Sequence, residues 1–303
     1  MESQIFDRHL QYLREEAIMY QSIDYSIDDK YPPRTDPLVD GRLLARKTTR
    51  YVSHYCYENV FVKRMVQAEE SDRAKSEWFP RPSHADRLRN EAAALEFLAA
   101  NTTIPVPKLL GLWEQDGGRL YLKTAVVKDG VEMFSLSDED QARALPVVAE
   151  EMERAILPQL RKRRRNRIGS VDPSLSIIPP VRLWSNIKKV CPPDDEGKRT
   201  WPVVFSHDGT DEFVFCHNDL RRANILVDPT TFHIVSIIDW EMSGFFPPDW
   251  DVLFYKANTQ LEYAKMTQAV LADNLALFSG AGQKYLEPKV EDNKERGDRD
   301  RVE

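Results

Sequence analysis

Cysteine is scarce in this sequence, and the few cysteines present form no pattern. The 303 residues include three, Cys56, Cys191 and Cys216. They are odd in number, far apart in the chain, and without the CxxC or histidine spacing that a zinc site uses. A zinc site is therefore not expected, and a reduced intracellular compartment fits best.

Long apolar runs are also missing. No stretch approaches the roughly 20 apolar residues that a membrane span needs. The N-terminal stretch through Glu16 is charged and amphipathic, and it lacks the basic start and apolar core of a secretory signal. We therefore expect a cytoplasmic protein without a membrane anchor.

An excess of positive charge is absent as well. The chain has 42 Lys and Arg against 49 Asp and Glu, a formal net charge of -7. Nucleic-acid phosphates call for a basic surface, so no nucleic-acid partner is expected, whereas an acidic balance favours a neutral or cationic small substrate. A hydrophobic content of 42% is ample for the core of one large domain or two lobes. The oligomeric state stays open.

The first half of the chain predicts a small lobe built on strands. Apolar positions at helical spacing indicate an N-terminal helix within residues 4–19. Val, Tyr and Phe over residues 42–65 favour two or three antiparallel strands. Residues 84–100 carry an apolar helical face. Two more strands are expected at 108–114 and 119–127, joined by a glycine turn.

The second half predicts a larger, mainly helical lobe. Helices are expected at 138–164 and 249–286, and the basic run at 161–165 is interpreted as a solvated helix face. The charged tail from Lys289 cannot bury apolar area to offset its ordering entropy. The expected domains are a helical extension over 1–40, a nucleotide-side lobe with an antiparallel sheet over 41–127, a lobe with the catalytic loop and substrate site over 128–288, and a disordered tail over 289–303.

The clearest chemical signal lies where buried strands end. Val214–Cys216 reads as a short strand that delivers Asp219 to a loop, and residues 225–238 read as a hairpin. Asp219, Asn224 and Asp239 therefore stand at the ends of adjacent strands, and we expect them to converge.

Phosphoryl transfer from ATP requires such a group of side chains. A carboxylate orients the attacking hydroxyl and accepts its proton, and oxygen ligands hold Mg²⁺. Asp219 suits the first task, and Asn224 and Asp239 suit the second. Arg221 could reach the transferring phosphate as a local cation. The alternative, that these residues only cap turns and strand ends, is disfavoured by the number of spaced features that coincide.

Two residues upstream supply a nucleotide side for this site. In protein-kinase sites a strand lysine contacts the α/β-phosphates and a helix glutamate holds it. Lys63 stands at the end of the strand candidate Val60–Val62, and Glu91 lies within the expected helix. Each alone would be a solvated surface residue. Their order and separation upstream of the loop favour a functional pair.

These motifs resemble the aminoglycoside phosphotransferase-like family of kinases, which includes the choline and ethanolamine kinases, and especially its fungal members. The likeness covers residues 55–265. Its specific motifs are Phe215–Leu220, Asn224–Asp228 and Ile237–Glu241 with Gly244–Pro247; its supporting motifs are Val62–Arg64, Glu91-Ala92, Thr103–Pro107 and Ile168–Val171.

The resemblance implies a two-lobed protein-kinase-like α+β fold with ATP between the lobes. It implies Asp219 as catalytic base, Asn224 and Asp239 as Mg²⁺ ligands, and adenine bonded to backbone near Thr124–Val127. Members of this family phosphorylate hydroxyls of small molecules more often than proteins. The implied activity is therefore that of an ATP- and Mg²⁺-dependent small-molecule kinase.

One part of the template is not evident. Leu43–Tyr57 contains no glycine, so no Gly-rich turn is visible to bring backbone N–H groups onto the phosphates. A pseudokinase-like nucleotide-binding scaffold without turnover is therefore an alternative. A protein kinase is a third and less favoured alternative, since Asp239 is followed so closely by Gly244–Pro248 that no long activation segment fits. The acceptor could be an amino alcohol, aminosugar, amino acid or secondary metabolite.

Side chains near Asp239 allow two interpretations each. Trp240 and the aromatics at 245, 246 and 250 could line a cage for a cationic group, but core packing is favoured. Glu241, Asp249 and Asp251 could attract an amine-bearing substrate, whereas Asp251 could instead cap a following helix.

Overall fold

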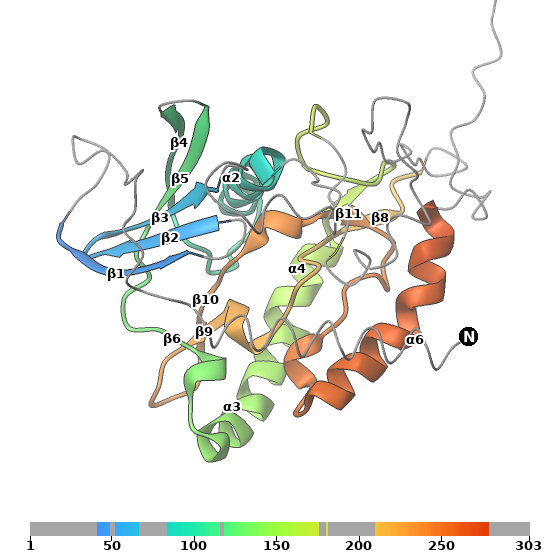
Figure 1. The fold of residues 1–303 in the computed structure, drawn as a ribbon. Coiled ribbons are helices and arrows are strands. Elements are labelled where there is room, and N and C mark those ends of the chain that lie inside the picture. Colours follow the sequence, from blue (N-terminus) through green and yellow to red (C-terminus); the bar gives the residue numbers. More distant parts are fainter. Residues whose placement is uncertain are drawn as a thin grey trace, which may run out of the picture.

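The computed structural model describes residues 41–48, 52–66, 84–115, 118–175, 180 and 210–278. The helix expected at 4–19 and the tail at 289–303 lie outside these residues. Within them, a strand-rich first half lies against a mainly helical second half (Figure 1). The two-lobed α+β fold predicted from the sequence is confirmed.

The first half is built on a five-stranded antiparallel sheet that carries one long helix. The strand order is β1-β2-β3-β5-β4, and each neighbouring pair is antiparallel. The strands and the helix expected in this half are thereby confirmed. Their bounds are β1 Leu43–Thr48, β2 Val52–Tyr57, β3 Val60–Met65, α2 His84–Asn101, β4 Leu109–Gln115 and β5 Arg119–Ala125.

Alternation along β5 shows how this sheet serves two apolar clusters. Successive side chains of a strand point to opposite faces. Leu120 and Leu122 pack with Leu88 of α2, whereas Tyr121 belongs to the cluster on the other face and stacks on Trp113 with ring centroids 5.2 Å apart. The sheet is therefore anchored to α2 on one side only, and α2 is fixed in position beside β3.

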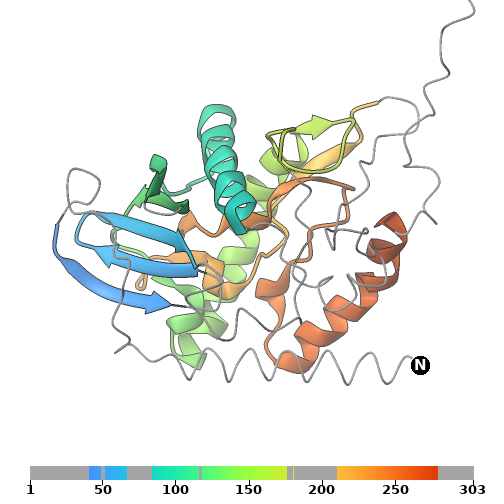
Figure 2. The same ribbon diagram turned by 45° about the horizontal axis from the view of Figure 1, so that its top comes forward.

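The second half combines helices with two small antiparallel sheets, in the orders β10-β9-β6 and β11-β8-β7. In both views α2 lies between the five-stranded sheet and the β8–β11 pair (Figure 2). No helix in the described part of the chain is both long and apolar enough to cross a membrane. The bounds are β6 Val131–Glu132, η2 Met133–Ser135, α3 Asp138–Glu151, η3 Met152–Ile156, α4 Leu157–Arg161, β7 Arg164–Arg165, β8 Phe213–Cys216, η5 Arg222–Asn224, β9 Ile225–Val227, β10 Ile234–Ile237, η6 Trp240–Met242, β11 Gly244–Phe246, η7 Phe254–Lys256 and α6 Gln260–Phe278.

The helix expected over 138–164 ends three residues early. It consists of α3, a π turn (η3) and α4, and it stops at Arg161. Pro158 has no N–H to donate to the carbonyl four residues before it, and the backbone widens to a π turn just ahead of it. Arg164–Arg165 pair with β8 instead. The basic run at 161–165 therefore crosses a helix end and a strand rather than lining one helix face.

The helix expected over 249–286 begins later than predicted, at Gln260. The residues before it follow an irregular path because their groups bind the loop after β8. The carboxylate of Asp251 accepts backbone N–H groups of that loop, and Tyr255 N donates to Leu220 O at 2.7 Å. Tertiary contacts thus override the helical pattern of this segment.

Two glycines allow β11 to approach the chain ahead of it. Phe245 N lies 2.8 Å from Gly169 O, and Gly169 N lies 3.0 Å from Phe245 O. A Cβ on Gly244 would lie only 2.5 Å from Gly169 O, which is backbone and cannot turn aside. Because β11 pairs with β8, this contact supports the strand that leads into the loop of Asp219.

Gly244→Ala is expected to lower the free energy of unfolding by about 1–3 kcal/mol, the usual cost of forcing extra volume into a packed site. Gly111→Ala is the matched control, because a Cβ there meets no heavy atom within 4 Å. Urea denaturation of both variants measures the difference. Equal stability of the two would contradict the close contact.

Candidate active site

Lys63 lies between two carboxylates from different parts of the chain. Its Nζ is 2.8 Å and 2.7 Å from the two carboxylate oxygens of Glu91, and 2.7 Å from Oδ1 of Asp239. Lys63 stands in the middle of β3 and is buried, not at a strand end as the sequence indicated. The expected pair of Lys63 and Glu91 is thus present, with Asp239 as a third member.

The charges of this trio depend on burial and on one another. Burial disfavours the Lys63 ammonium, but Asp239 and Glu91 outweigh it and raise the pKa of Lys63. Burial would also raise the pKa of Asp239, yet Lys63 holds that pKa well below its usual range. Burial raises the pKa of Glu91 by more than the attraction of Lys63 lowers it, so the pKa of Glu91 lies above its usual value. Asp239 is therefore the carboxylate that stays ionised most firmly.

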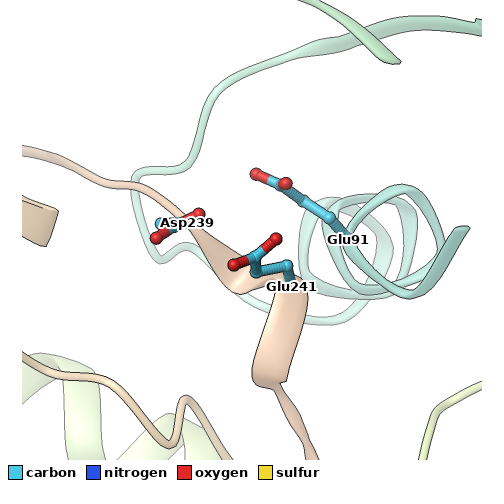
Figure 3. Close-up of side chains that lie close together, drawn as sticks. All are labelled: Glu91, Asp239 and Glu241. Carbon is cyan, nitrogen blue, oxygen red and sulfur yellow. The ribbon is translucent and has the colours of Figure 1, made fainter. Parts of the chain in front are cut away.

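A third carboxylate, Glu241, lies beside Glu91 and Asp239. One oxygen of each lies within 4.8 Å of the others, and Figure 3 shows Glu91 extending from α2 toward the segment that carries the other two. Arg87 of α2 forms an ion pair with Glu241. Lys63 forms ion pairs with Glu91 and Asp239. The three acids are therefore held in ion pairs with two cations, and they do not form an open set of metal ligands.

Asp219 stands in the loop after β8, in a tight group with two neighbours. Arg221 Nη2 lies 2.6 Å from its Oδ2, and Asn224 Nδ2 lies 2.8 Å from its carbonyl oxygen and 3.1 Å from Oδ2. The Asp219 side chain is 5% exposed and that of Arg221 27%. A cation and an amide donor thus orient one nearly buried carboxylate.

The β9–β10 hairpin brings Asp239 to this loop. Ile238 N donates to Asn224 O at 3.0 Å, and His217 Nε2 lies 2.9 Å from Ile238 O. Asp239 follows at once in a left-handed conformation with φ of 66°, which turns the chain away from the strand. The hairpin agrees with the sequence-based expectation, and the hydrogen bond from Ile238 to Asn224 shows that Asp239 directly follows a residue bound to that loop.

His217 contacts both the backbone of Asp219 and that of the residue directly after β10. Its Nδ1 accepts from Asp219 N at 3.2 Å, while Nε2 faces Ile238 O. A ring with its single proton on Nε2 satisfies both contacts. Its centroid lies 4.4 Å from that of the Trp240 ring. His217 therefore orients Asp219 through the backbone.

Asp251 holds the same loop from the opposite side. Its Oδ2 accepts from His217 N at 2.8 Å and its Oδ1 from Asn218 N at 2.9 Å. It is not a helix cap, because no helix begins at this point. The sequence offered Asp251 as a cap or an amine contact, and neither interpretation foresaw this role.

Asp251→Ala is expected to cost about 3 kcal/mol of stability, since two charge-assisted hydrogen bonds to backbone are lost. Asp249→Ala is the control, because Asp249 is exposed and lies two residues away. Denaturant unfolding of both proteins measures the effect. A loss of under 1 kcal/mol for Asp251→Ala would contradict the role assigned to this carboxylate.

Arg222 is a residue that the sequence analysis did not single out. Its guanidinium donates to Tyr255 O, to Gln141 Oε1 and to Asn258 Oδ1, at 2.9, 2.9 and 2.8 Å. It thus ties η5, the turn that carries Asn224, to α3 and to the segment before α6. Its place between the motifs Phe215–Leu220 and Asn224–Asp228 was the available signal, because its partners lie far away in the sequence.

The aromatic residues after Asp239 belong to the core. Trp240, Phe245, Phe246 and Trp250 are all buried and form part of the main apolar cluster. Phe246 stacks on Trp250 with centroids 5.1 Å apart. Core packing, the favoured interpretation, is confirmed, and these rings do not form an exposed cage.

Asn224 and Asp239 offer oxygen atoms of the kind that Mg²⁺ binds. Asn224 directs its NH₂ group at Asp219, so its amide oxygen faces away from that carboxylate. Asp239 is ionised, and its side chain is 28% exposed. Mg²⁺ takes carboxylate and amide oxygens and keeps several waters. The chemistry of these residues fits the ion, and within the described chain no hydrogen bond joins them directly.

Comparison with known proteins places the chain in a family. A family model described as "Phosphotransferase enzyme family" (APH) matches residues 58–276. "Probable choline kinase 1" of Arabidopsis thaliana is 34% identical over 73 residues, which is 24% of this chain and 20% of the plant protein. The match thus spans about a fifth of that protein's length.

Two solved structures are distantly similar. The GDP complex of a mutant aminoglycoside 2'-phosphotransferase is 13% identical with a TM-score of 0.44, covering 82% of this chain and 85% of that one. An aminoglycoside phosphotransferase with GDP and kanamycin is 14% identical with a TM-score of 0.41, covering 91% and 90%. The assignment depends on the family model, whose match includes Lys63, Glu91, Asp219 and Asp239. The chain belongs to the phosphotransferase enzyme family.

Proposed function

We propose that this chain is an ATP- and Mg²⁺-dependent kinase that transfers the γ-phosphoryl group to a hydroxyl of a small molecule. The observation that carries the proposal is the trio of Lys63, Glu91 and Asp239 beside the loop of Asp219 and Asn224. This arrangement supplies a cation for phosphates, oxygen ligands for a metal, and a carboxylate for the acceptor.

Each residue has a distinct task in this mechanism. Lys63, held by Glu91, contacts phosphate oxygens of ATP. Asp219 orients the acceptor hydroxyl and takes its proton as the oxygen attacks the γ-phosphorus and the bond to ADP breaks. Asn224 and Asp239 would hold Mg²⁺, which when bound would neutralise the phosphate charge. Catalysis is then mainly positioning and electrostatics.

Arg221 serves both the base and the transferred group. Its Nη2 lies 2.6 Å from Oδ2 of Asp219, and this charge-assisted hydrogen bond orients the carboxylate. With substrates present, the same cation lies close enough to the loop to stabilise charge on the moving phosphoryl group. The ion pair also keeps the Asp219 carboxylate ordered before the acceptor arrives.

We infer that the acceptor carries a cationic nitrogen as well as a hydroxyl. The plant relative is named a probable choline kinase, and one of the similar structures contains kanamycin. The net charge of -7 favours a cationic substrate over an anionic one. We assign residues 41–127 to the nucleotide side and residues 128–288 to the substrate side, in a cytoplasmic enzyme that needs no nucleic-acid or membrane partner.

The second candidate is a pseudokinase-like scaffold that binds nucleotide without turnover. The observation that favours it is the absence of glycine from Leu43–Tyr57, where backbone N–H groups would otherwise cover the phosphates. The complete set of Asp219, Asn224 and Asp239 favours the enzyme.

Screening for ADP release distinguishes the two candidates. Purified protein is incubated with ATP and Mg²⁺ and with amino alcohols, aminosugars, amino acids and neutral sugars in turn. If the chain is the kinase, we expect ADP release that depends on one class of acceptor and stops when EDTA is added. If it is a scaffold, we expect nucleotide to raise the unfolding temperature, but no acceptor-dependent release of ADP.

A further inference from the structure

The turn that follows Asp239 is held by asparagine side chains from two directions. The carbonyl oxygens of residues 241, 242 and 243 each accept a hydrogen bond from an asparagine amide. Asn90 of α2 supplies two of these bonds and Asn218 of the catalytic loop supplies the third. Three consecutive carbonyls are thus fixed by groups far away in the sequence.

Asn90 uses both hydrogens of its amide on this turn. Its Nδ2 lies 3.0 Å from Glu241 O and 2.8 Å from Ser243 O, and the side chain is fully buried. The reverse orientation of the amide would set its oxygen against two carbonyl oxygens, so the donor assignment is firm. Asn90 also precedes Glu91, the residue that holds Lys63, on the same helix.

Asn218 reaches the turn from the other side. Its Nδ2 lies 2.8 Å from Met242 O, and its own backbone N is bound by Asp251. It adopts φ of 71°, a left-handed conformation that asparagine tolerates better than most residues. The residue between His217 and Asp219 thus links the loop of the base to the turn that Asp239 begins.

Neutral amides suit this position for an electrostatic reason. The turn lies beside the carboxylates of Glu91, Asp239 and Glu241. A lysine or arginine here would pair with those carboxylates and compete with Lys63, and an aspartate would repel the backbone carbonyls. An asparagine can bind the carbonyls and leave the ion pairs undisturbed.

We propose that Asn90 and Asn218 are positioning residues, which fix the turn over residues 240–243 and thereby hold the Asp239 carboxylate in place for Mg²⁺. The inference rests on the proposed function. It adds that the metal aspartate is fixed to α2 and to the catalytic loop before any ligand binds. A small displacement of a metal ligand is costly, so groups that orient ligands affect metal affinity by about 10- to 100-fold.

The test compares Asn90→Ala with Asn101→Ala, both on α2. Asn101 makes the same kind of bond, from Nδ2 to Phe97 O at 2.8 Å, but at the far end of the helix. Asn218→Gly is the second variant, because glycine keeps the left-handed conformation without the amide. Each protein is examined by hydrogen exchange of a peptide covering residues 239–246, without ligand, and by titration with AMP-PNP in Mg²⁺ or in EDTA.

The proposal predicts exchange at least about tenfold faster in this peptide for Asn90→Ala and Asn218→Gly. It also predicts that Mg²⁺ strengthens AMP-PNP binding about tenfold less than in wild type, with unchanged affinity in EDTA. Asn101→Ala should match wild type in both. Wild-type exchange in Asn90→Ala and Asn218→Gly would overturn the holding role, and faster exchange with an unaltered Mg²⁺ effect would overturn the positioning role. If wild type itself binds no nucleotide, the proposed function fails, and the exchange experiment still decides whether the asparagines hold the turn.

Discussion

Asp219→Asn is expected to lower kcat by about 10²- to 10⁴-fold, the range over which a general base contributes. The amide keeps the size of the side chain but cannot accept the proton of the acceptor hydroxyl. The bond from Asn224 and the contact with Arg221 are weakened and not sterically blocked. The measurement is ADP release at saturating ATP with the acceptor that the screen identifies.

Glu139→Gln is the control for this result, because it removes an exposed carboxylate on α3. It should retain wild-type turnover. The affinity of Asp219→Asn for AMP-PNP should stay within about threefold of wild type. A general base acts in the transition state, so its loss should lower turnover and leave nucleotide binding nearly unchanged. Unaltered turnover in Asp219→Asn would remove this residue from the chemical step.

Asp239→Asn is expected to abolish the strengthening of nucleotide binding by Mg²⁺. The carboxylate that Lys63 keeps ionised is replaced by a neutral amide, and Mg²⁺ binds an amide oxygen more weakly than a carboxylate. The loss should exceed about tenfold, because even residues that only orient metal ligands produce that much. Titration calorimetry with AMP-PNP in Mg²⁺ and in EDTA separates the metal-dependent part.

Glu241→Gln is a demanding control for this variant. Glu241 belongs to the same acidic group but is paired with Arg87, so its loss should leave most of the Mg²⁺ effect. If Glu241→Gln removed the effect and Asp239→Asn did not, the metal ligand would have been assigned to the wrong carboxylate.

The local sequence pattern predicted which helices and strands form, whereas tertiary contacts determine where the helices begin and end. The strands and α2 followed from periodicity, because their apolar faces are buried against one another. The ends of the helices at 138–164 and 249–286 did not. The first is cut short where β7 pairs with β8, and the second is delayed because the chain before Gln260 binds the catalytic loop. Partners of that kind have no signature in the local sequence.

The site was predictable where chemistry depends on side-chain type and spacing. Lys63 and Glu91 lie together as their order and separation indicated, whereas the contact of Lys63 with Asp239 was not predicted. Asn90 and Asp251 were not foreseen in their roles, because both bind backbone atoms. Any residue has such atoms, and only the folded path of the chain decides which of them need a partner.

The most direct measurement of the central claim is calorimetric titration of the wild-type protein with AMP-PNP in Mg²⁺ and in EDTA, beside Lys63→Met. Lys63→Met removes the cation that touches both Glu91 and Asp239, and thermal unfolding of the free protein verifies that it is still folded. We predict saturable wild-type binding that is stronger with Mg²⁺, and a loss of at least about tenfold in a folded Lys63→Met variant. Wild-type protein that binds no nucleotide in either buffer would contradict the assignment of this site.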